Sequence, residues 1–276
     1  MTASALLSVR DLTVDYPSRH GPVRAVNGVS FSVAPGSVLG VVGESGSGKS
    51  SIGYALMRLT DASHATLGGA VTFEGRDLLA LSGRDWRKLR GNRIAMVFQD
   101  AMATLNPVMR VGDQIGEVFR FHRPDMSRRA IRSASLDLLE RVGIQEASRR
   151  IDAYPHQLSG GMRQRVVIAA AIALKPALLI ADEPTTALDV TVQAQILRLM
   201  QELSREQGTA MILISHDLDV VSDVCEDVVV MKDGVIVEAG HVDDVLSRPR
   251  HAYTLQLLNA RPSFGAGHMQ SEVSHG

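Results

Sequence analysis

The sequence predicts an α/β fold with an antiparallel β subdomain near its N-terminus and an inserted helical subdomain. Three segments, residues 38–42, 177–181 and 210–215, are apolar without alternation, which is typical of parallel strands covered on both faces. Two earlier segments, residues 7–16 and 26–33, have apolar residues at nearly two-residue spacing, which indicates antiparallel strands. The two patterns therefore predict two kinds of sheet in one chain.

The composition supports a folded chain and narrows its possible partners. The 276 residues are 45% hydrophobic, which is ample for a core, and their net charge of −1 gives no overall basic field that would attract nucleic acid. The N-terminus has no charged segment followed by a long apolar one, and the longest apolar run, residues 166–174, has about half the length of a membrane span. We therefore expect a chain that is neither secreted nor membrane-spanning by itself.

Shorter signals predict the remaining elements. Residues 71–75 indicate one more antiparallel strand. Residues 100–175 are expected to be mostly helical, and Ser127 can cap a helix that Gly143 ends. Another amphipathic helix is expected to follow Asp189.

The chain divides into one domain, residues 1–262, and a flexible C-terminal tail, residues 263–276. The tail mixes glycine, serine and histidine without a period, so it cannot bury enough apolar surface to order itself. A weak metal contact through His268 and His275 is the alternative role for this segment.

A glycine-rich loop follows the first apolar segment. Its sequence, GESGSGKS at residues 43–50, matches the pattern G-x-x-x-x-G-K-[ST] and leads into a segment that can continue as a helix. The glycines let backbone N–H groups turn toward phosphate oxygens, the lysine reaches the β and γ phosphates, and the serine hydroxyl joins a Mg²⁺ shell. A flexible surface turn is the alternative. The candidate nucleotide-binding residues here are Gly43, Glu44, Ser45, Gly46, Ser47, Gly48, Lys49, Ser50 and Ser51.

Two carboxylates end the second apolar segment. Asp182 and Glu183 follow ALLIA; the first can hold Mg²⁺ and the second can orient or deprotonate an attacking water. Two carboxylates at one strand end would repel each other without a cation between them. The alternative is a solvated strand end. Together with the loop, the pair predicts a nucleoside triphosphatase.

Four stretches occur in the order found in one family. GESGSGKS, LSGGMRQR at residues 158–165, ALLIADEP and ISHD resemble the nucleotide-binding subunits of ATP-binding cassette (ABC) transporters, from about Leu7 to Pro262. The resemblance implies a P-loop NTPase fold of the ABC type with ATP and Mg²⁺ as cofactors. It also implies a head-to-tail dimer of such subunits.

The resemblance assigns the SGG turn of one subunit to the γ-phosphate of ATP held by its partner. Ser159, Gly160 and Gly161 would bind that phosphate in trans, and Asp189 would cross the same dimer interface. Local roles also explain these residues, because Ser159 and Asp189 can cap helices and the glycines can form a plain turn. The nearby Arg163 and Arg165 are expected to be structural or solvated.

Three further positions receive roles from the resemblance. Gln99 would reach Mg²⁺ and the attacking water, His216 would contact the γ-phosphate, and Tyr16 would stack on adenine. Alternatively, Gln99 is an ordinary polar residue at a strand end, His216 is a structural histidine and Tyr16 packs within its strand. The resemblance thus implies Glu183, His216 and Gln99 as catalytic residues and Ser50, Gln99 and Asp182 as metal ligands.

Longer stretches narrow the resemblance to one branch. FQDAMATLNPVMRVGDQIGE, ADEPTTALDVTVQAQIL and YPHQLSGGMRQR are similar to the ATPase subunits of dipeptide, oligopeptide and nickel importers. The C-terminal RHAYTLQLLNARP is similar to the His-Pro-Tyr-Thr motif of that branch, with Ala252 in place of the proline.

The branch implies an ATP-hydrolysing subunit that energises uptake of di- or oligopeptides, nickel or a related small solute. Its partners would be a second, related ABC ATPase subunit, two transmembrane permease subunits and an extracytoplasmic solute-binding protein, at the cytoplasmic face of the cell membrane and without nucleic acid. An ABC-type ATPase of DNA repair or translation and a catalytically silent regulatory subunit are the alternatives.

Two remaining features have competing explanations. Cys225 is the only cysteine, so we expect no iron–sulfur cluster and a buried, inert thiol. The basic run at residues 84–93 includes Trp86 and could bind nucleic acid, but one such run in a neutral chain favours a solvated face.

Overall fold

In the computed structural model of the chain, the described residues are 5–60, 65–186 and 188–260. The expected flexible tail, residues 263–276 with His268 and His275, lies outside the described residues. Within the described ranges, no helix has both the length and the apolar character that a membrane span requires.

A six-stranded sheet forms the centre of the described part of the chain, in the order β10-β9-β3-β8-β7-β6. Strands β9, β3, β8, β7 and β6 run parallel to one another, and the edge strand β10 is antiparallel to β9. The three apolar segments are thereby confirmed as parallel strands. The strands are β3 (Val38–Val42), β6 (Ile94–Val97), β7 (Leu178–Asp182), β8 (Ala210–Ser215), β9 (Asp227–Lys232) and β10 (Val235–His241).

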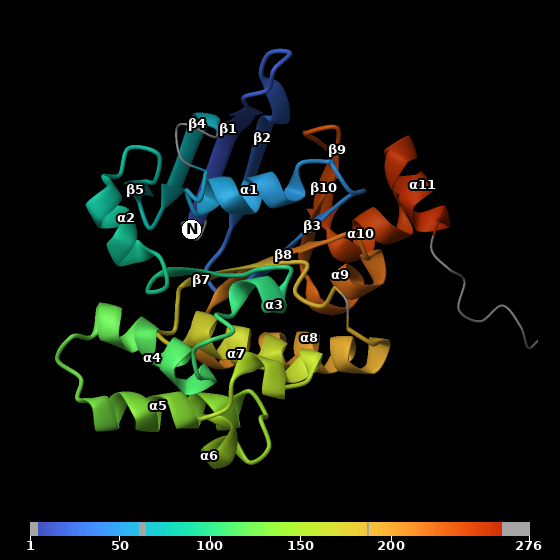
Figure 1. Ribbon diagram of the computed structural model, residues 1–276. Helices are drawn as coiled ribbons and strands as arrows, with labels where there is room; N and C mark the ends of the chain where they lie inside the picture. Colours follow the sequence, from blue (N-terminus) through green and yellow to red (C-terminus); the bar gives the residue numbers. More distant parts are fainter. Residues whose placement is uncertain (1–4, 61–64, 187, 261–276) are drawn as a thin grey trace, which may run out of the picture.

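A second, four-stranded sheet has the order β2-β1-β4-β5 and lies above the first in Figure 1. Adjacent strands of this sheet are antiparallel. The sequence predicts three of the four strands, β1, β2 and β4. The strands are β1 (Leu7–Tyr16), β2 (Val23–Val33), β4 (Thr66–Phe73) and β5 (Arg76–Asp77).

Alternate residues of the central sheet face two different cores. In β3, Leu39 and Val41 pack in the core shared with the antiparallel sheet and α1 (Lys49–Leu56). Val38 and Val42 pack in the core on the helical side. Because both faces are covered, every β3 residue is buried, which explains an apolar run without alternation.

The helical subdomain occupies the lower half of Figure 1, and residues 100–175 are mostly helical, as predicted. Ser127 accepts the N–H of Ala130 as the N-cap of α5, and Gly143, with φ +75°, follows its end. The helices are α3 (Ala101–Thr104), α4 (Val111–His122), α5 (Arg128–Arg141), α6 (Ala147–Arg150), the 3₁₀ turn η1 (Pro155–Gln157) and α7 (Gly160–Ile172).

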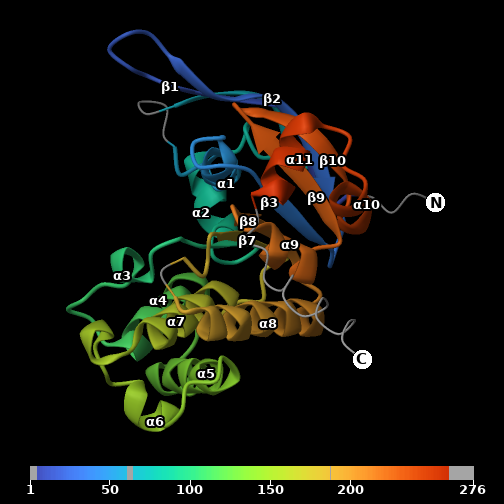
Figure 2. The ribbon, with the colours of Figure 1, turned by 90° about the vertical axis from the view of Figure 1, so that its right-hand side faces the viewer.

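Helix α7 has almost no exposed face because other elements surround it. It contacts α3, α4, α5 and β6, together with α8 (Val190–Gln207), which is the predicted amphipathic helix. Figures 1 and 2 place α8 beside α7, on the side of the central sheet away from the antiparallel sheet. The sequence signals do not predict the β9–β10 hairpin, α2 (Gly83–Leu89), α9 (Leu218–Val224), α10 (Val242–Ser247) or α11 (Ala252–Asn259).

The two features with competing explanations are both buried. Cys225 is 6% exposed, and burial raises the pKa of its thiol to about 12. Trp86 is 1% exposed, and its indole N–H donates to the carbonyl of Leu78, so the ring has no face free for a base. The guanidinium of Arg90 lies 5.3 Å from the centroid of this buried ring, so the contact between them belongs to the fold and leaves no aromatic face for nucleic acid.

Candidate active site

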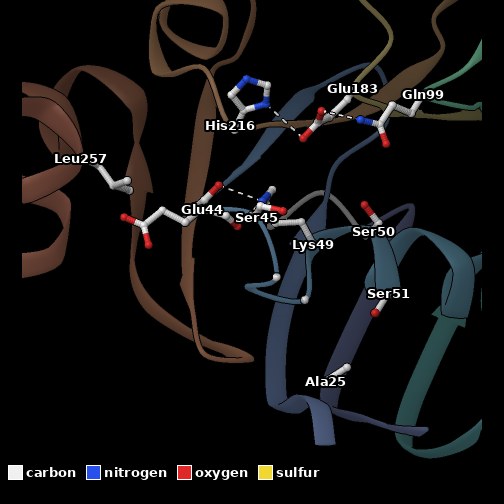
Figure 3. Close-up of a pocket in the computed structure, with 13 residues that line it drawn as sticks. Ala25, Glu44, Ser45, Lys49, Ser50, Ser51, Gln99, Glu183, His216 and Leu257 are labelled. Atoms are coloured by element: carbon white, nitrogen blue, oxygen red, sulfur yellow. Dashed lines mark hydrogen bonds and ion pairs between the residues drawn. The ribbon is translucent and has the colours of Figure 1, made fainter. Parts of the chain in front are cut away.

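The candidate residues gather at one edge of the central sheet. Four adjacent parallel strands end there, and each is followed by residues singled out in the sequence: the glycine-rich loop after β3, Gln99 after β6, Glu183 after β7 and His216 after β8. Carboxyl ends of parallel strands meet at the same edge, which is where ligands of open α/β sheets bind. Figure 3 shows Gln99, Glu183 and His216 side by side, facing the loop.

Two glycines of the loop, Gly43 and Gly48, are required by the close approach of neighbouring backbone. Gly43 has φ +153°, and a Cβ there would lie 2.2 Å from the carbonyl oxygen of Met231. Gly48 has φ +96°, and its Cβ would lie 2.2 Å from the carbonyl oxygen of Ala25. Helix α1 begins immediately after the loop, so its free N–H groups and dipole favour an anion there.

The side chain of Lys49 is buried beneath the glycine-rich loop. Its ammonium donates to the carbonyls of Gly43 at 2.8 Å and Glu44 at 2.7 Å, and to Oγ of Ser47 at 3.4 Å. Burial lowers the pKa of this lysine, although the nearby carboxylates of Glu183 and Asp182 oppose that shift. The ammonium is therefore held on backbone carbonyls beside the place for a phosphate.

Asp182 has the properties of a cation ligand. Oγ of Ser50 donates to its Oδ1 at 2.9 Å, whereas its Oδ2 is buried without a hydrogen-bond partner. Burial raises the pKa of this carboxyl, and the charge of Glu183 raises it further. A bound cation would give the free oxygen a partner and stabilise the charged form, so the residues present fit a hard divalent ion.

Glu183 is held by three side chains. Gln99 Nε2 and Thr186 Oγ1 both donate to Oε2 at 2.9 Å, and His216 Nδ1 lies 3.1 Å from Oε1. The backbone of Glu183 has φ +44°, which is uncommon for a residue with a side chain. Such strain persists where the surroundings impose it and is frequent at active sites.

A cavity of about 630 Å³ opens between these groups. Asp182 and Ser47 lie behind its wall, through their bonds to Ser50 and Lys49. Ala25 and Leu257 line the cavity but were not identified from the sequence. The predicted residues that line it are Gly43, Glu44, Ser45, Gly46, Gly48, Lys49, Ser50, Ser51, Gln99, Glu183 and His216.

Tyr16 lies next to the loop but does not line the cavity. Its hydroxyl donates to Oγ of Ser51 at 3.2 Å, and its ring packs partly against the core under the antiparallel sheet. This position is compatible with both strand packing and an adjacent base, so adenine stacking stays a prediction.

The residues expected to act in trans do not line this cavity. Ser159 caps α7 by accepting the N–H of Met162, and Asp189 caps α8 by accepting the N–H of Val192. Gly161 also has a packing role, because a Cβ there would lie 2.8 Å from Cγ1 of Val192, whereas one on Gly160 would meet nothing closer than 3.5 Å. Their local roles are therefore real, and their action on a partner's nucleotide stays a prediction.

Arg163 and Arg165 are structural. Arg163 donates to the carbonyl of Pro155 at 2.7 Å, and Arg165 donates to the carbonyl of Val142 at 2.5 Å. Both therefore tie α7 to the segments that precede it.

Besides Ala25 and Leu257, two further residues at the site were missed by sequence reasoning. Thr186 belongs to the quoted stretch TTALD, where its spacing from Glu183 could have suggested a contact. Tyr253, whose hydroxyl accepts the N–H of Glu44 at 3.0 Å, lies in α11 within the RHAYTLQLLNARP segment, and no local signal connects it to the loop.

The chain is similar to known proteins over most of its length. The family model for ABC transporters matches residues 26–186. An oligopeptide transport ATP-binding protein, OppD, of Escherichia coli is 51% identical over 96% of this chain and 78% of its own. A dipeptide transport ATP-binding protein, DppD, of Haemophilus influenzae is 47% identical over 99% of this chain and 82% of its own.

Solved structures with the same fold are also ATP-binding cassettes. The dimeric post-hydrolysis structure of the cassette MJ0796, bound to ADP and Pi, has a TM-score of 0.77 and 28% identity over 86% of this chain and 98% of its own. The cassette cbiO1 of Clostridium perfringens has a TM-score of 0.73 and 28% identity over 88% and 91% of the two chains. With this fold, this site and these relatives, the chain belongs to the ABC transporter family, as one of its nucleotide-binding ATPase subunits.

Proposed function

We propose that this chain hydrolyses ATP to energise the import of short peptides through separate membrane-spanning permeases. The observation that carries the proposal is the arrangement of Lys49, Ser50 and Glu183 around one cavity, with Asp182 hydrogen-bonded to Ser50 behind its wall. Peptide as the cargo is supported by the relatives at 47–51% identity, which are oligopeptide and dipeptide transport proteins. These relatives give no support to a role in DNA repair or translation.

The triphosphate would lie along the glycine-rich loop. Backbone N–H groups of the loop and of the first turn of α1 would donate to its oxygens, and Lys49, held on its backbone carbonyls, would reach the β and γ phosphates. Tyr16 would stack on the adenine.

Ser50, Asp182 and Gln99 would hold Mg²⁺. When bound, this ion would neutralise charge that develops on the β and γ phosphate oxygens. The side chain of Ser50 and the unpartnered Oδ2 of Asp182 are already adjacent, so these two ligands need little movement. Gln99 would bind the ion through its amide oxygen, since its amide nitrogen donates to Glu183.

Glu183 would act as general base. Its carboxylate would accept a proton from water as the water oxygen attacks the γ-phosphorus and ADP leaves. His216 would contact the γ-phosphate from the other side, and its present distance of 3.1 Å from Glu183 keeps the two within reach of one reacting group. Thr186 would continue to orient the base.

A second cassette would complete each site. Ser159 and Gly160 are exposed at the start of α7, which offers free N–H groups and a positive helix end to a partner's γ-phosphate. Gly161 would add its N–H, and Asp189 would lie at the same interface. The dimeric state of the related cassette bound to ADP and Pi supports this arrangement.

The same relatives support the proposed partners. We propose a second, related ATPase subunit, two permease subunits and an extracytoplasmic peptide-binding protein, with this chain attached to the cytoplasmic face of the membrane. The alternative cargo within this family branch is nickel or another small solute.

The test is to purify a tagged Glu183→Gln chain from its native membranes with Mg-ATP and to identify the co-purifying chains by mass spectrometry. Slow hydrolysis should trap the assembled complex, so two permease chains and a second cassette are expected. The matched control is Glu202→Gln, which changes an exposed carboxylate on α8 and should recover less of the assembly. Recovery of ribosomal or nucleic-acid partners without a membrane protein would refute the transport role.

A further inference from the structure

The C-terminal helix α11 forms part of the wall of the nucleotide cavity. The carboxylate of Glu238 accepts the backbone N–H groups of Arg250 at 2.8 Å and His251 at 3.1 Å, which anchors the start of the helix on β10. Further along, Leu257 lines the cavity on the side opposite Ser50 and Ser51 (Figure 3). Helix α11 is therefore brought to the site, although Tyr253 on it lies 209 residues from Glu44 in sequence.

Tyr253 makes the direct contact between α11 and the loop. The residue is 3% exposed, and its hydroxyl accepts the N–H of Glu44 at 3.0 Å. The ammonium of Lys232 lies 4.9 Å from its ring centroid, which fixes the ring from the β9 side. Ring and hydroxyl thus have separate roles: the ring packs, and the hydroxyl holds the loop backbone.

The peptide group held by Tyr253 is also the one that holds Lys49. The N–H of Glu44 and the carbonyl of Gly43 belong to one planar peptide unit. Tyr253 accepts from its N–H, and the ammonium of Lys49 donates to its carbonyl at 2.8 Å. Rotation of this unit would therefore disturb both contacts together.

The loop needs such a restraint at this point. Gly43 has φ +153°, a conformation that glycine tolerates but does not enforce, so this residue does not lock the orientation of the following peptide. Lys49 holds the carbonyl of that peptide, and the hydroxyl of Tyr253 holds its N–H from outside the loop. Without it, the N–H of Glu44 would have to find water or turn toward another acceptor.

We infer that Tyr253 is a positioning residue for nucleotide binding, which acts through the Gly43–Glu44 peptide to set the place of the Lys49 ammonium. The inference rests on the proposed function of the cavity as the ATP site. It gives helix α11 a role in nucleotide affinity, while the chemical step stays with Glu183.

The test compares Tyr253→Phe with the wild-type chain and with Gln256→Ala, a change on the exposed side of the same helix. Phenylalanine keeps the buried ring, so the variant should fold. The dissociation constant of Mg-ATP, measured with a fluorescent analogue, should rise about three- to tenfold in Tyr253→Phe, the usual effect of losing one neutral hydrogen bond. The KM of ATP hydrolysis should rise with it, with kcat within about twofold of wild type. Gln256→Ala should match the wild type.

The nucleotide-free melting temperature separates positioning from folding. It should stay within about 3 °C of wild type in Tyr253→Phe, since only one hydrogen bond is lost. If the wild-type chain binds Mg-ATP and Tyr253→Phe binds it with the same affinity, the inference is overturned and the proposed function stays intact. Affinity that falls only in step with a large loss of melting temperature would also overturn it. A wild-type chain that does not bind Mg-ATP would overturn the proposed function, and this inference with it.

Discussion

Replacing Glu183 by Gln tests the chemistry of the site with little change in its packing. In the structure, Oε2 accepts from Gln99 and Thr186, and Oε1 lies 3.1 Å from His216 Nδ1. The amide oxygen of glutamine can take the place of Oε2, and its NH₂ can donate to Nδ1 when that histidine carries its proton on Nε2. The substitution therefore leaves every neighbour a partner, and it removes the negative charge and the ability to accept a proton from water.

The expected loss is that of a general base. Turnover of ATP should fall by about 10²–10⁴-fold, equivalent to about 2.7–5.4 kcal/mol of barrier, while the dissociation constant of Mg-ATP changes by less than about threefold. Phosphate release and equilibrium nucleotide binding measure the two quantities on the same preparation. Glu202→Gln, an exposed change on α8, is the matched control and should retain wild-type turnover. Turnover of Glu183→Gln within about threefold of wild type would refute the assigned role.

Three further predictions concern the loop, the packing of α7 and the single thiol. Lys49→Ala should weaken Mg-ATP binding by about 10–150-fold in an equilibrium titration, because a charged donor is lost, whereas the exposed Lys88→Ala should bind normally. Gly161→Ala should lower the free energy of unfolding by about 1–3 kcal/mol in denaturant titrations, because its Cβ would overlap an α8 side chain at 2.8 Å, while Gly160→Ala should cause no loss; equal effects would contradict this packing argument. The raised pKa of about 12 keeps Cys225 protonated, so thiol labelling at pH 8 should be roughly 10³-fold slower in the folded chain than after unfolding, and rapid labelling of the folded chain would contradict its burial.

Those parts of the site that depend on contiguous residues could be predicted from the sequence. All residues of the phosphate-binding pattern lie within residues 43–50, so the loop can be found from the sequence alone. Asp182 and Glu183 can be found because they follow the apolar residues of a buried strand. Parallel strands then determine where their carboxyl ends meet, so the approach of Gln99 and His216 to Glu183 follows once the sheet is known.

Contacts between distant segments could not be predicted in this way. Tyr253 and Glu44 are 209 positions apart, and the elements that bring them together, the β9–β10 hairpin and α11, carry weak signals. Gly161 shows a different difficulty: the motif alone suggests a phosphate contact, whereas the close approach of Val192 becomes visible only once α7 and α8 pack. Residues with two roles are thus the ones that sequence describes incompletely.

Peptide uptake measures the central claim most directly. A strain that lacks this chain would be complemented with the wild type, with Glu183→Gln or with Glu202→Gln, and uptake of labelled dipeptide, pentapeptide and nickel would be compared. We expect the wild type and Glu202→Gln to restore uptake of at least one peptide, and Glu183→Gln to restore none. Peptide uptake that is the same with and without the chain would contradict the proposed import of peptides, and restored uptake of nickel alone would give the chain a different cargo.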